Sequence, residues 1–480
     1  MSQSRLASCV PLPLENKVLV EVIEKAKDWA LMHGVGMRDK KHFNKDVIQI
    51  APFVLLPSPF PRTEFNKAIE LQPVLNELMH KVAHDERFLE QTLQNALQVD
   101  EFTSNLYDIW VKVRNEGITQ SLSLGLFRSD YLMQRDGNKI KQVEFNTIAS
   151  SFGAITSNLP SMFRYILRSL GMVDKIKHMP ENRALSGLCA GIIEAYDLFG
   201  VPGSVVLFVV EEVSYNICDQ RFHEFQISET RPDIQVIRKT LNEIYEETEL
   251  NDKKQLILEG KAVAVVYYRS GYEPAQYPSS REWDARLRVE RSSAIKCPSI
   301  HYQLAGTKKV QQALALPGAL EKFIGAGASS GRVRDIFTGL YSLDFDEAGE
   351  RALEMAIADA ERFVLKPQRE GGGNNLYGDD VRDALLRLRH SRERAAYILM
   401  ERILPPLVSG YVVRPGAPVP PPLTDLVSEL GIFGVIIGTK DKIYCNRQVG
   451  HMLRTKLADA NEGGVAAGLG ALDSPYLLDM

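Results

Sequence analysis

The sequence predicts an α/β (α+β) protein in which a parallel α/β unit is inserted into a larger fold. Three observations support this fold class. From Glu15 to about Leu170, apolar residues recur at spacings of three and four, which is the period of amphipathic helices. From about Gly200, short apolar runs alternate with polar segments of helix length, as they do in parallel sheets. Beyond this unit, the glycine-rich stretch 325–331 and the proline-rich stretch 414–422 predict surface connections around a further unit.

The individual elements follow in chain order. The segments VLVEVIEKAKDWALMHG and FLEQTLQNAL predict helices, and IQIAPFVLLPSPFPR between them predicts a strand that prolines interrupt. The inserted unit extends from Gly200 to about Leu304, and its predicted strands are the apolar runs 205–210, 234–238 and 262–268. Near the C-terminus, SELGIFGVII predicts a buried strand.

Composition and charge limit the classes of function. The 480 residues carry a net charge of -4 and the pI is near 6.2, so the sequence shows no basic footprint for nucleic acid. The five cysteines are scattered and form no CxxC pair, which argues against a disulfide framework or a zinc site. No apolar run approaches the roughly 18 residues of a membrane span. We therefore expect a cytoplasmic protein that binds neither nucleic acid nor membrane.

The segment KPQREGGGNNLY, residues 366–377, has the composition of a clasp for a nucleotide and Mg²⁺. Consecutive glycines let backbone N–H groups approach anionic oxygens closely, and Lys366 adds a compact positive charge. Glu370 fits beside phosphates only when a cation lies between them, which is how carboxylates and nucleotide phosphates usually share Mg²⁺. The three glycines also predict a lid that closes over the nucleotide. An ordinary surface turn is the alternative.

A second set of oxygen ligands is found in KQVEFNTIASS. On an extended strand Glu144 and Asn146 project from the same face, because side chains alternate between the two faces. Together with Glu370 they would supply the hard oxygen ligands that Mg²⁺ prefers. The alternative is an amphipathic strand whose polar face is solvated.

The C-terminal segment HMLRTKLADANEGGVAAG again combines cations with small residues. Arg454 and Lys456 share one face of an extended strand. A guanidinium suits a substrate carboxylate and an ammonium suits a phosphate, while the small residues of the loop 463–468 allow close backbone approach. Upstream, Glu429 is a candidate acceptor for ribose hydroxyls. A basic surface strand with a flexible tail is the alternative.

Polar residues also follow two strands of the inserted unit. Asn216, Gln220 and Arg221 come after the first strand, and Arg269 comes directly after the run 262–268. Ligands of open α/β sheets bind outside the carboxyl ends of the strands. These residues are therefore candidates for holding a polar substrate with a carboxylate, and ordinary loop polarity is the alternative.

Segments spread over nearly the whole chain carry a resemblance to a known family. They are RNEGITQSLSLGL, RSDY, EFNTI, NICDQR, QLAGTKKVQQ, FVLKPQREGGGNNLYG, YILMERI, SELGIFGV, VGHMLRTK and GGVAAG. In this order they resemble the eukaryotic-type glutathione synthetases of the ATP-grasp superfamily. The resemblance implies an ATP-grasp fold and ATP-dependent ligation of glycine to γ-glutamylcysteine, giving glutathione, ADP and phosphate through an acyl phosphate. It also implies ATP and Mg²⁺ as cofactors and a homodimer.

The resemblance further implies a role for each matching residue. The expected Mg²⁺ ligands are Glu144, Asn146 and Glu370, and the expected catalytic residues are Arg454, Lys366 and Lys308. The expected ATP contacts are Glu144, Lys308, Lys366, Pro367, Gln368, Arg369, Glu370, Gly371, Gly372, Gly373, Asn374, Asn375, Tyr377, Met400, Glu401, Arg402, Ile403, Glu429, Lys456 and Glu462. The expected substrate contacts are Arg128, Ile148, Ala149, Ser150, Ser151, Ser214, Tyr215, Asn216, Gln220, Arg269, Ser270, Gly271, Tyr272, Arg454, Val465 and Ala466.

Combined with the pattern of segments, the resemblance divides the chain into three parts. Residues 1–204 form the N-terminal part of the ATP-grasp core and carry metal and substrate residues. Residues 205–304 form the substrate-binding α/β domain. Residues 305–480 form the ATP-binding part, with a lid at about 340–420 and a C-terminal loop rich in glycine and alanine.

Some positions depart from the family pattern, and rival functions remain. Arg402 stands where lysine is expected, and Glu462 stands where aspartate is frequent. Neither Ser214 nor Tyr215 is the expected residue. One rival is a related ligase that uses another amine, such as β-alanine, and another is a nucleotide-binding regulator without catalysis. A P-loop phosphotransferase is disfavoured because the sequence lacks GxxxxGK[ST].

Overall fold

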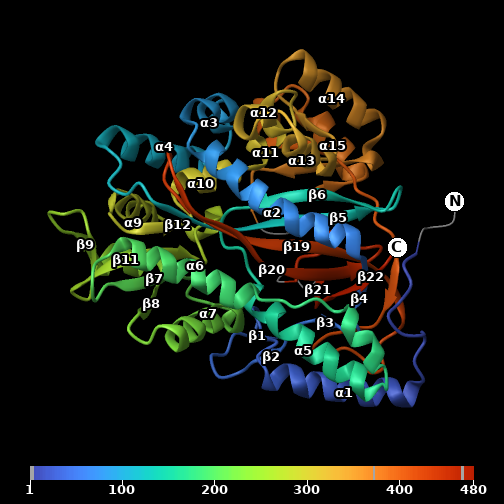
Figure 1. Cartoon of the computed structure of the whole chain (residues 1–480). Coiled ribbons are helices and arrows are strands. Elements are labelled where there is room, and N and C mark those ends of the chain that lie inside the picture. The colour runs from blue at the N-terminus through green and yellow to red at the C-terminus, as the bar shows by residue number, and fades with distance from the viewer. Residues whose placement is uncertain (1–4, 371–372, 466–469) are drawn as a thin grey trace.

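The computed structural model describes residues 5–370, 373–465 and 470–480, and within these residues fourteen strands form one large mixed sheet (Figure 1). The strands are β3 (Phe53–Val54), β5 (Ser123–Gln134), β6 (Lys139–Asn146), β7 (Val205–Val209), β8 (Gln235–Lys239), β9 (Thr248–Leu250), β10 (Leu256–Leu258), β11 (Lys261–Tyr268), β12 (Ile295–Cys297), β17 (Val408–Gly410), β18 (Val412–Val413), β19 (Thr424–Gly438), β20 (Ile443–Leu457) and β21 (Gly470–Asp473). The main path runs β18-β3-β21-β20-β19-β5-β12-β11-β10-β9, with β17 beside β19, β6 beside β5, β7 beside β11 and β8 beside β7.

Helices cover both faces of the large sheet. One face packs against α1 (Asn16–Met32), α5 (Gly153–Ser169), α6 (Ala184–Phe199) and α7 (Ile217–Thr230). The other face packs against α2 (Arg62–Ala83), α3 (Glu86–Leu93), α4 (Glu101–Glu116), α8 (Leu241–Glu247), α9 (Ser280–Arg291), α10 (Ile300–Ala305), α11 (Lys308–Leu314), α12 (Ala319–Ile324) and α13 (Ala328–Ile336). In Figure 1, α1 and α5 lie below the sheet and α3 and α4 lie above it.

The central strand β19 contributes to the hydrophobic cores on both faces. Phe433 and Val435 belong to one core, whereas Ile432 and Ile436 belong to the other, because successive side chains of a strand point to opposite faces. A strand buried on both faces reads as a nearly continuous apolar run. This explains the segment SELGIFGVII and confirms the buried strand that it predicts.

The N-terminal region is less helical than its periodicity predicts. α1 and α3 occupy the two segments predicted as helices, and α2 and α4 are further helices of the same region. The long strands β5 and β6 follow them, so the prediction of a mostly helical region is wrong for these residues. β5 is buried along almost its whole length and lacks the alternation of a strand with one solvated face. The predicted proline-interrupted strand forms three short pieces, β2 (Gln49–Ile50), β3 and β4 (Ser58–Pro61). β2 pairs with β1 (Gly36–Met37), and β4 pairs with β22 (Pro475–Leu478).

The predicted parallel strands form one end of the large sheet. β7, β8 and β11 match the three predicted runs and form parallel pairs, and β12, which the sequence does not predict, pairs in parallel with β11. β12 also pairs in parallel with β5 through Lys296 and Ser123. These strands therefore continue the central sheet, and their carboxyl ends point in the direction in which β5 runs.

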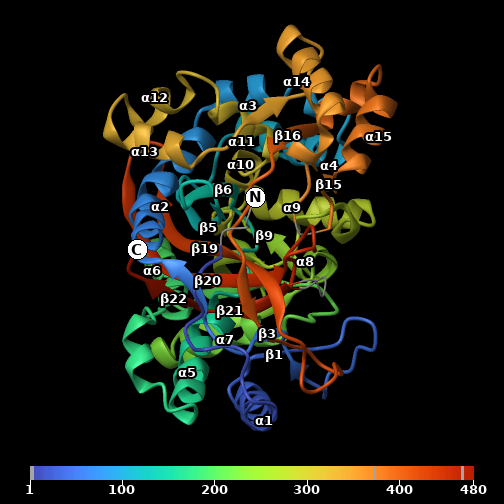
Figure 2. The ribbon, with the colours of Figure 1, turned by 90° about the vertical axis from the view of Figure 1, so that its right-hand side faces the viewer.

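A separate four-stranded sheet carries the glycine-rich segment. Its strands, in order, are β13 (Leu340–Ser342), β16 (Tyr397–Glu401), β14 (Phe363–Pro367) and β15 (Leu376–Tyr377). Together with α14 (Glu347–Ala358) and α15 (Asp379–Leu388) it has its own hydrophobic core, which includes Leu353, Phe363 and Leu385. In Figure 2, α14 and α15 lie at the top of the molecule. Gly371 and Gly372, which follow β14, lie outside the described residues.

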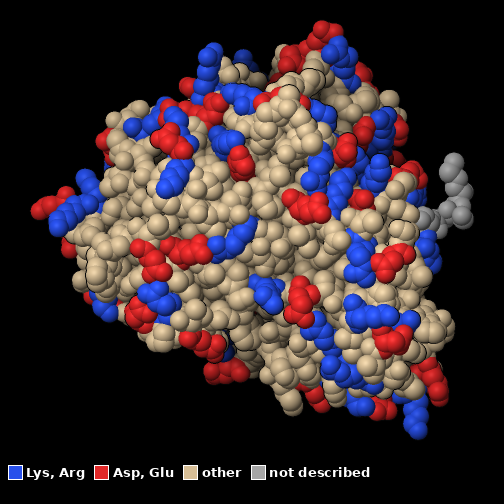
Figure 3. Space-filling model, viewed as in Figure 1, with Lys and Arg blue, Asp and Glu red and all other residues tan. Residues whose placement is uncertain are grey.

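The remaining helices are short. They are the 3₁₀ helices η1 (Ala96–Gln98), η2 (Val173–His178), η3 (Pro274–Gln276), η4 (Ala360–Arg362) and η5 (Arg392–Ala396). Among all the helices that the structure describes, none is both long and apolar enough to cross a membrane. On the face shown in Figure 3, basic and acidic side chains are interspersed, in keeping with the 57 Lys and Arg and 61 Asp and Glu of the sequence.

Candidate active site

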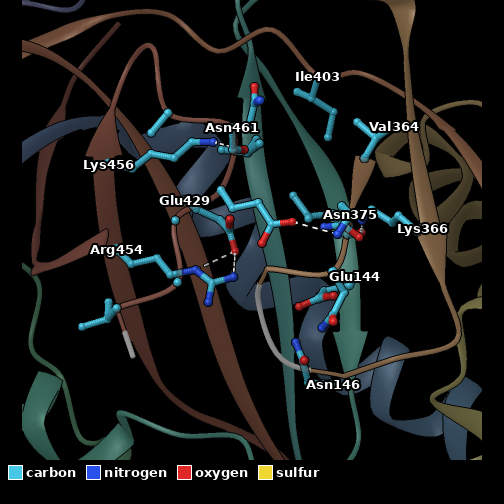
Figure 4. A pocket seen from close by; sticks show the side chains of 18 of the residues that line it. Glu144, Asn146, Val364, Lys366, Asn375, Ile403, Glu429, Arg454, Lys456 and Asn461 are labelled. Carbon is cyan, nitrogen blue, oxygen red and sulfur yellow. Dashed lines mark hydrogen bonds and ion pairs between the residues drawn. The ribbon is translucent and has the colours of Figure 1, made fainter. Parts of the chain in front are cut away.

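A cavity of about 530 Å³, here called the central cavity, is lined by strands of both the large and the four-stranded sheet. Glu144 comes from β6, Lys366 from β14, Glu429 from β19 and Arg454 from β20 (Figure 4). The fold thus collects in one place residues that the sequence analysis connects with metal, phosphates and substrate.

The ammonium group of Lys308 lies between two carboxylates beside the central cavity. Its Nζ is 3.2 Å from Glu144 Oε2 and 3.2 Å from each carboxylate oxygen of Glu370. Burial alone lowers the pKa of an ammonium group, but the charges of Glu144 and Glu370 outweigh burial and raise the pKa of Lys308 above its ordinary value. Lys308 is therefore a permanent cation that neutralises part of the charge of the two glutamates.

The two glutamates differ in their electrostatic surroundings. Burial alone raises the pKa of each carboxyl group. At Glu144 the cations Lys308 and Lys366 outweigh burial, so the pKa lies below its ordinary value. At Glu370 burial prevails and the pKa is raised. A further cation between the two groups would favour the charged form of both.

Asn146 provides a third oxygen beside the two glutamates. Its Nδ2 donates to Asp130 Oδ2 at 2.9 Å and to the carbonyl oxygen of Arg128 at 3.3 Å. The amide oxygen Oδ1 is therefore the atom of this side chain that would bind a cation. In the described part of the chain, no three or more His, Cys, Asp and Glu side chains are grouped to hold a metal ion. Two carboxylates and one amide oxygen still fit Mg²⁺, because this ion usually keeps water and phosphate oxygens as its other ligands.

Arg454 is held by carboxylates on one side of the central cavity. Its Nε donates to Glu429 Oε1 at 3.0 Å, and its Nη2 makes a second contact with the same oxygen (Figure 4). Nη2 also lies 3.6 Å from Asp130 Oδ2. These charges outweigh burial and raise the pKa of Arg454 above its ordinary value. Glu429, which the sequence analysis connects with a ribose, is thus the ion-pair partner of the guanidinium.

Two ammonium groups in the lining of the cavity bond to carbonyl oxygens. Lys366 Nζ donates to the carbonyl of Val143 at 2.9 Å, and Lys456 Nζ donates to the carbonyl of Asn461 at 2.5 Å. Burial lowers the pKa of both lysines. Because a carbonyl oxygen carries no net charge, these groups retain their attraction for anionic ligands such as phosphates.

Glu462 connects the C-terminal loop to the glycine-rich segment. Its carboxylate accepts hydrogen bonds from the backbone N–H of Gly373 and, at 3.0 Å, from that of Asn375. Backbone N–H groups of such loops also bind phosphate oxygens. The expected contact residues Gly371, Gly372 and Ala466 lie outside the described residues.

A buried arginine holds the loop that follows β6. Arg128 contacts Asp130 at 2.6 and 2.8 Å and donates to the carbonyl oxygen of Ser151 at 3.2 Å. Asp130 also accepts a hydrogen bond from Asn146, so this one buried carboxylate positions both Arg128 and Asn146 in the cavity wall. Asp130 is not among the sequence-predicted site residues, although its spacing of two from Arg128 on a strand puts both on one face.

A second buried carboxylate holds the other side of this loop. Asp219 accepts hydrogen bonds from the backbone N–H of Phe152 and of Ala154, each at 2.9 Å. It also pairs with Arg269 at 2.8 Å, and Arg269 in turn donates to Ser151 Oγ at 3.0 Å. Phe152 has a φ of +74°, a left-handed conformation that is uncommon outside glycine. The surrounding hydrogen bonds therefore fix a strained turn at the cavity wall.

Two buried polar atoms of residues that line the central cavity have no hydrogen-bond partner among the described residues. They are Ser150 Oγ and Asn216 Oδ1, and both residues line the central cavity. An unsatisfied buried polar group costs free energy. The wall is therefore suited to a polar ligand that would hydrogen bond with these atoms.

Most of the sequence-predicted site residues line the central cavity. They are Arg128, Glu144, Asn146, Ile148, Ala149, Ser150, Ser151, Tyr215, Asn216, Tyr272, Lys366, Glu370, Asn374, Asn375, Tyr377, Met400, Glu401, Arg402, Ile403, Glu429, Arg454, Lys456, Glu462 and Val465. Some other candidates make contacts behind the wall. Gln368 Oε1 accepts from the backbone N–H of Lys309 at 3.0 Å, and Arg369 pairs with Asp100. Ser214 and Gln220 both accept from Arg238, at 3.2 and 2.6 Å.

The structure adds cavity residues that the sequence analysis missed. They are Lys40, Leu132, Arg135, Val143, Phe152, Glu273, Val364, Leu404, Pro405, Leu407, Val427, Ala458, Ala460 and Asn461. Several apolar members lie an even number of residues from a predicted polar residue on the same strand, so the alternation of side chains between the two faces would have indicated them. Lys40 and Glu273 lie on loops and carry no comparable signal.

Comparison with known proteins links this architecture to one family. The family model described as "Eukaryotic glutathione synthase, ATP binding domain" matches residues 16–477. The glutathione synthetase of Rattus norvegicus is 44% identical over 467 residues, which cover 96% of this chain and 98% of that protein. The Homo sapiens glutathione synthetase has the same identity and the same coverage. The chloroplastic glutathione synthetase of Arabidopsis thaliana is 40% identical over 476 residues, with coverages of 97% and 86%.

A solved structure shows the same architecture. It is that of a glutathione synthetase-like effector from Globodera pallida in its apo form, with a TM-score of 0.78 and 26% identity. The alignment covers 98% of this chain and 100% of the effector. Similarity in both sequence and structure therefore extends over nearly the whole chain.

Proposed function

The chain belongs to the eukaryotic glutathione synthase family, and from this premise we propose which residues of the central cavity perform its reaction. It is an ATP-dependent ligase that joins glycine to γ-glutamylcysteine and releases glutathione, ADP and phosphate. One observation carries the assignment of residues: buried cations and carboxylates from both sheets converge on a single cavity.

The chemistry requires activation of a carboxylate. An amine does not attack a carboxylate at a useful rate, because oxide is a poor leaving group. Transfer of the γ-phosphoryl group of ATP to the cysteine carboxylate of γ-glutamylcysteine gives an acyl phosphate and ADP. The glycine nitrogen then forms a bond to the acyl carbon, the carbon–oxygen bond to phosphate breaks, and the amine loses a proton. Positioning and electrostatics supply the catalysis, so no protein nucleophile is needed.

In our proposal Arg454 holds the reacting carboxylate, and the lysines bind phosphates. Arg454 is permanently charged and offers a planar fork of donors that matches a carboxylate. Lys366 and Lys456 bond only to carbonyl oxygens in the contacts recorded for the described residues, which leaves their charges for phosphate oxygens. Tyr377 and the segment 400–403 would surround the adenosine.

Glu144, Asn146 and Glu370 would hold Mg²⁺. The ion would screen the phosphates from the two glutamates and neutralise charge on the transferring group. Lys308 supports the assignment, because a cation already lies between the two carboxylates. The chain's own contribution is to keep these carboxylates together, with Lys308 between them.

We also propose the larger-scale organisation that the resemblance implies. The separate sheet and core of β13–β16 with α14 and α15 support a lid within residues 340–420. On the basis of the same resemblance, we propose that the chain is divided into residues 1–204, 205–304 and 305–480 and that it forms a homodimer. Five free cysteines are compatible with a reducing cytoplasm.

Replacing Arg454 by lysine should lower kcat/KM for γ-glutamylcysteine by about 10- to 100-fold, because a point charge cannot reproduce a two-point bond to a carboxylate. The KM for ATP should stay nearly unchanged. Steady-state kinetics with each substrate varied in turn measures both effects. The control is Arg447→Lys on the same strand, whose guanidinium pairs with Glu194 instead. An equal loss of ATP affinity in Arg454→Lys would assign Arg454 to the phosphates.

The function itself is tested by product identification. The protein is incubated with MgATP, γ-glutamylcysteine and one of glycine, β-alanine or serine, and the products are identified by mass. We expect glutathione from glycine, with one ADP formed per glutathione, and no product from Lys366→Met. A predominant β-alanine product would indicate the related ligase, and the absence of any product would indicate a regulator.

A further inference from the structure

Two residues of opposite charge line the central cavity near the loops of the parallel strands. They are Lys40 and Glu273, and they lie with Tyr215, Asn216 and Tyr272 in the lining. Neither charged residue has a role in the assignment above. Their position relative to the reacting centre indicates what they bind.

The cavity has a nucleotide end and an opposite end. At the first, Arg135 follows β5 and donates its backbone N–H to the carbonyl oxygen of Leu404, next to the proposed adenosine segment, at 2.8 Å. β6 runs antiparallel to β5, away from the nucleotide end, and carries Glu144 near its C-terminal end. The loop after β6 then reaches Arg269 through Ser151, at 3.0 Å. Tyr272 and Glu273 follow Arg269 closely in the chain, so they lie beyond the metal carboxylates, away from the nucleotide.

Lys40 is an exposed cation with an aromatic partner. Its Nζ lies 5.2 Å from the centre of the Tyr215 ring, and no ion pair is recorded for it among the described residues. By contrast, Arg128 is paired with Asp130 and Arg269 with Asp219. Lys40 is therefore, in the part of the chain that the structure describes, a cation at this end of the cavity whose charge remains for a ligand carboxylate.

Glu273 is a half-buried carboxylate that Gln276 holds in place. Gln276 Nε2 donates to Glu273 Oε1 at 3.3 Å, and its Oε1 accepts from the Glu273 backbone N–H at 3.4 Å. The same Nε2 donates to Glu211 Oε1 at 3.0 Å, and Glu211 lines a neighbouring pocket. A carboxylate has about four acceptor positions, so Glu273 keeps capacity for an ammonium group.

We propose that Lys40 and Glu273 form the subsite for the free α-amino-acid group of the γ-glutamyl residue. Lys40 binds its α-carboxylate, and Glu273 binds its α-ammonium. The inference rests on the proposed function, which supplies γ-glutamylcysteine as the substrate. In this γ-linked peptide the ammonium and the carboxylate are attached to the same terminal carbon. In the α-linked isomer the side-chain methylene groups separate them, so the charged pair selects the γ linkage.

The test combines two variants with two substrate analogues. Glutarylcysteine lacks the α-ammonium, and 4-aminobutyrylcysteine lacks the α-carboxylate. The wild-type protein should use each analogue with a kcat/KM about 10- to 100-fold below that for γ-glutamylcysteine, because each leaves a charged partner unmatched. Lys40→Met should lose discrimination against 4-aminobutyrylcysteine alone. Glu273→Gln should lose discrimination against glutarylcysteine alone. The KM for ATP should not change in either variant.

Matched controls are Lys41→Met and Glu229→Gln, which remove exposed charges outside the cavity lining and should discriminate as the wild type does. If Lys40→Met and Glu273→Gln keep the wild-type discrimination, the subsite assignment is wrong while wild-type glutathione formation still supports the proposed function. If the wild type forms no glutathione from γ-glutamylcysteine, the proposed function fails and this inference fails with it.

Discussion

Replacing Lys308 by methionine should lower the free energy of unfolding by about 3 kcal/mol and abolish measurable turnover. The variant leaves the carboxylates of Glu144 and Glu370, each 21% exposed, facing each other without the shared cation. Removing one partner from a buried ion pair is costly because the remaining charge stays desolvated. Urea denaturation in metal-free buffer measures the loss.

Magnesium gives this prediction a second readout. If Glu144 and Glu370 hold Mg²⁺, millimolar Mg²⁺ should restore part of the lost stability in Lys308→Met and stabilise the wild type less. The matched control is Lys309→Met. Lys309 is equally buried, but its Nζ pairs with Asp344 at 2.6 Å and Ser342 at 2.8 Å, so its loss of stability should not respond to Mg²⁺. Equal responses in the two variants would contradict the metal site.

Replacing Glu370 by glutamine should lower kcat at limiting Mg²⁺ by about 100- to 1,000-fold, because electrostatic stabilisation of the transferring group is the main source of catalysis here. Stability should change little, since Lys308 keeps its contact with Glu144 at 3.2 Å. Turnover measured against Mg²⁺ concentration, together with thermal unfolding, separates the two effects.

The control for Glu370→Gln is Glu347→Gln, which removes an exposed carboxylate from α14 of the same sheet and helix unit. It should behave as the wild type does in both measurements. Wild-type Mg²⁺ dependence in Glu370→Gln would remove this residue from the metal site.

The sequence predicts those parts of the site that depend on local geometry. Glu144 and Asn146 could be assigned to one face because a strand alternates, and β6 carries them as expected. Glu370 could be proposed as a metal ligand from its chemistry, because a carboxylate beside the expected phosphate-binding loop would require a cation. Arg454 and Lys456 follow the same alternation on β20. Strands buried on both faces, such as β5, could not be recognised because they lack that alternation.

The remaining parts of the site depend on tertiary packing. Lys308 begins α11, and Gln368 anchors this helix by accepting the backbone N–H of Lys309, so Lys308 meets the two glutamates only in the folded chain. Lys40 and Glu273 come from two loops whose spacing in the sequence carries no period. Their proximity to one cavity is visible only once the sheet has brought both loops together.

The central claim is that the central cavity activates the cysteine carboxylate of γ-glutamylcysteine by phosphorylation. γ-Glutamylcysteine labelled with ¹⁸O in both oxygens of that carboxylate tests the claim directly. We predict that each glutathione formed is accompanied by one phosphate carrying a single ¹⁸O, while the new amide keeps the other labelled oxygen. Mass spectrometry of the phosphate measures the transfer. Glutathione formed together with unlabelled phosphate would contradict the claim.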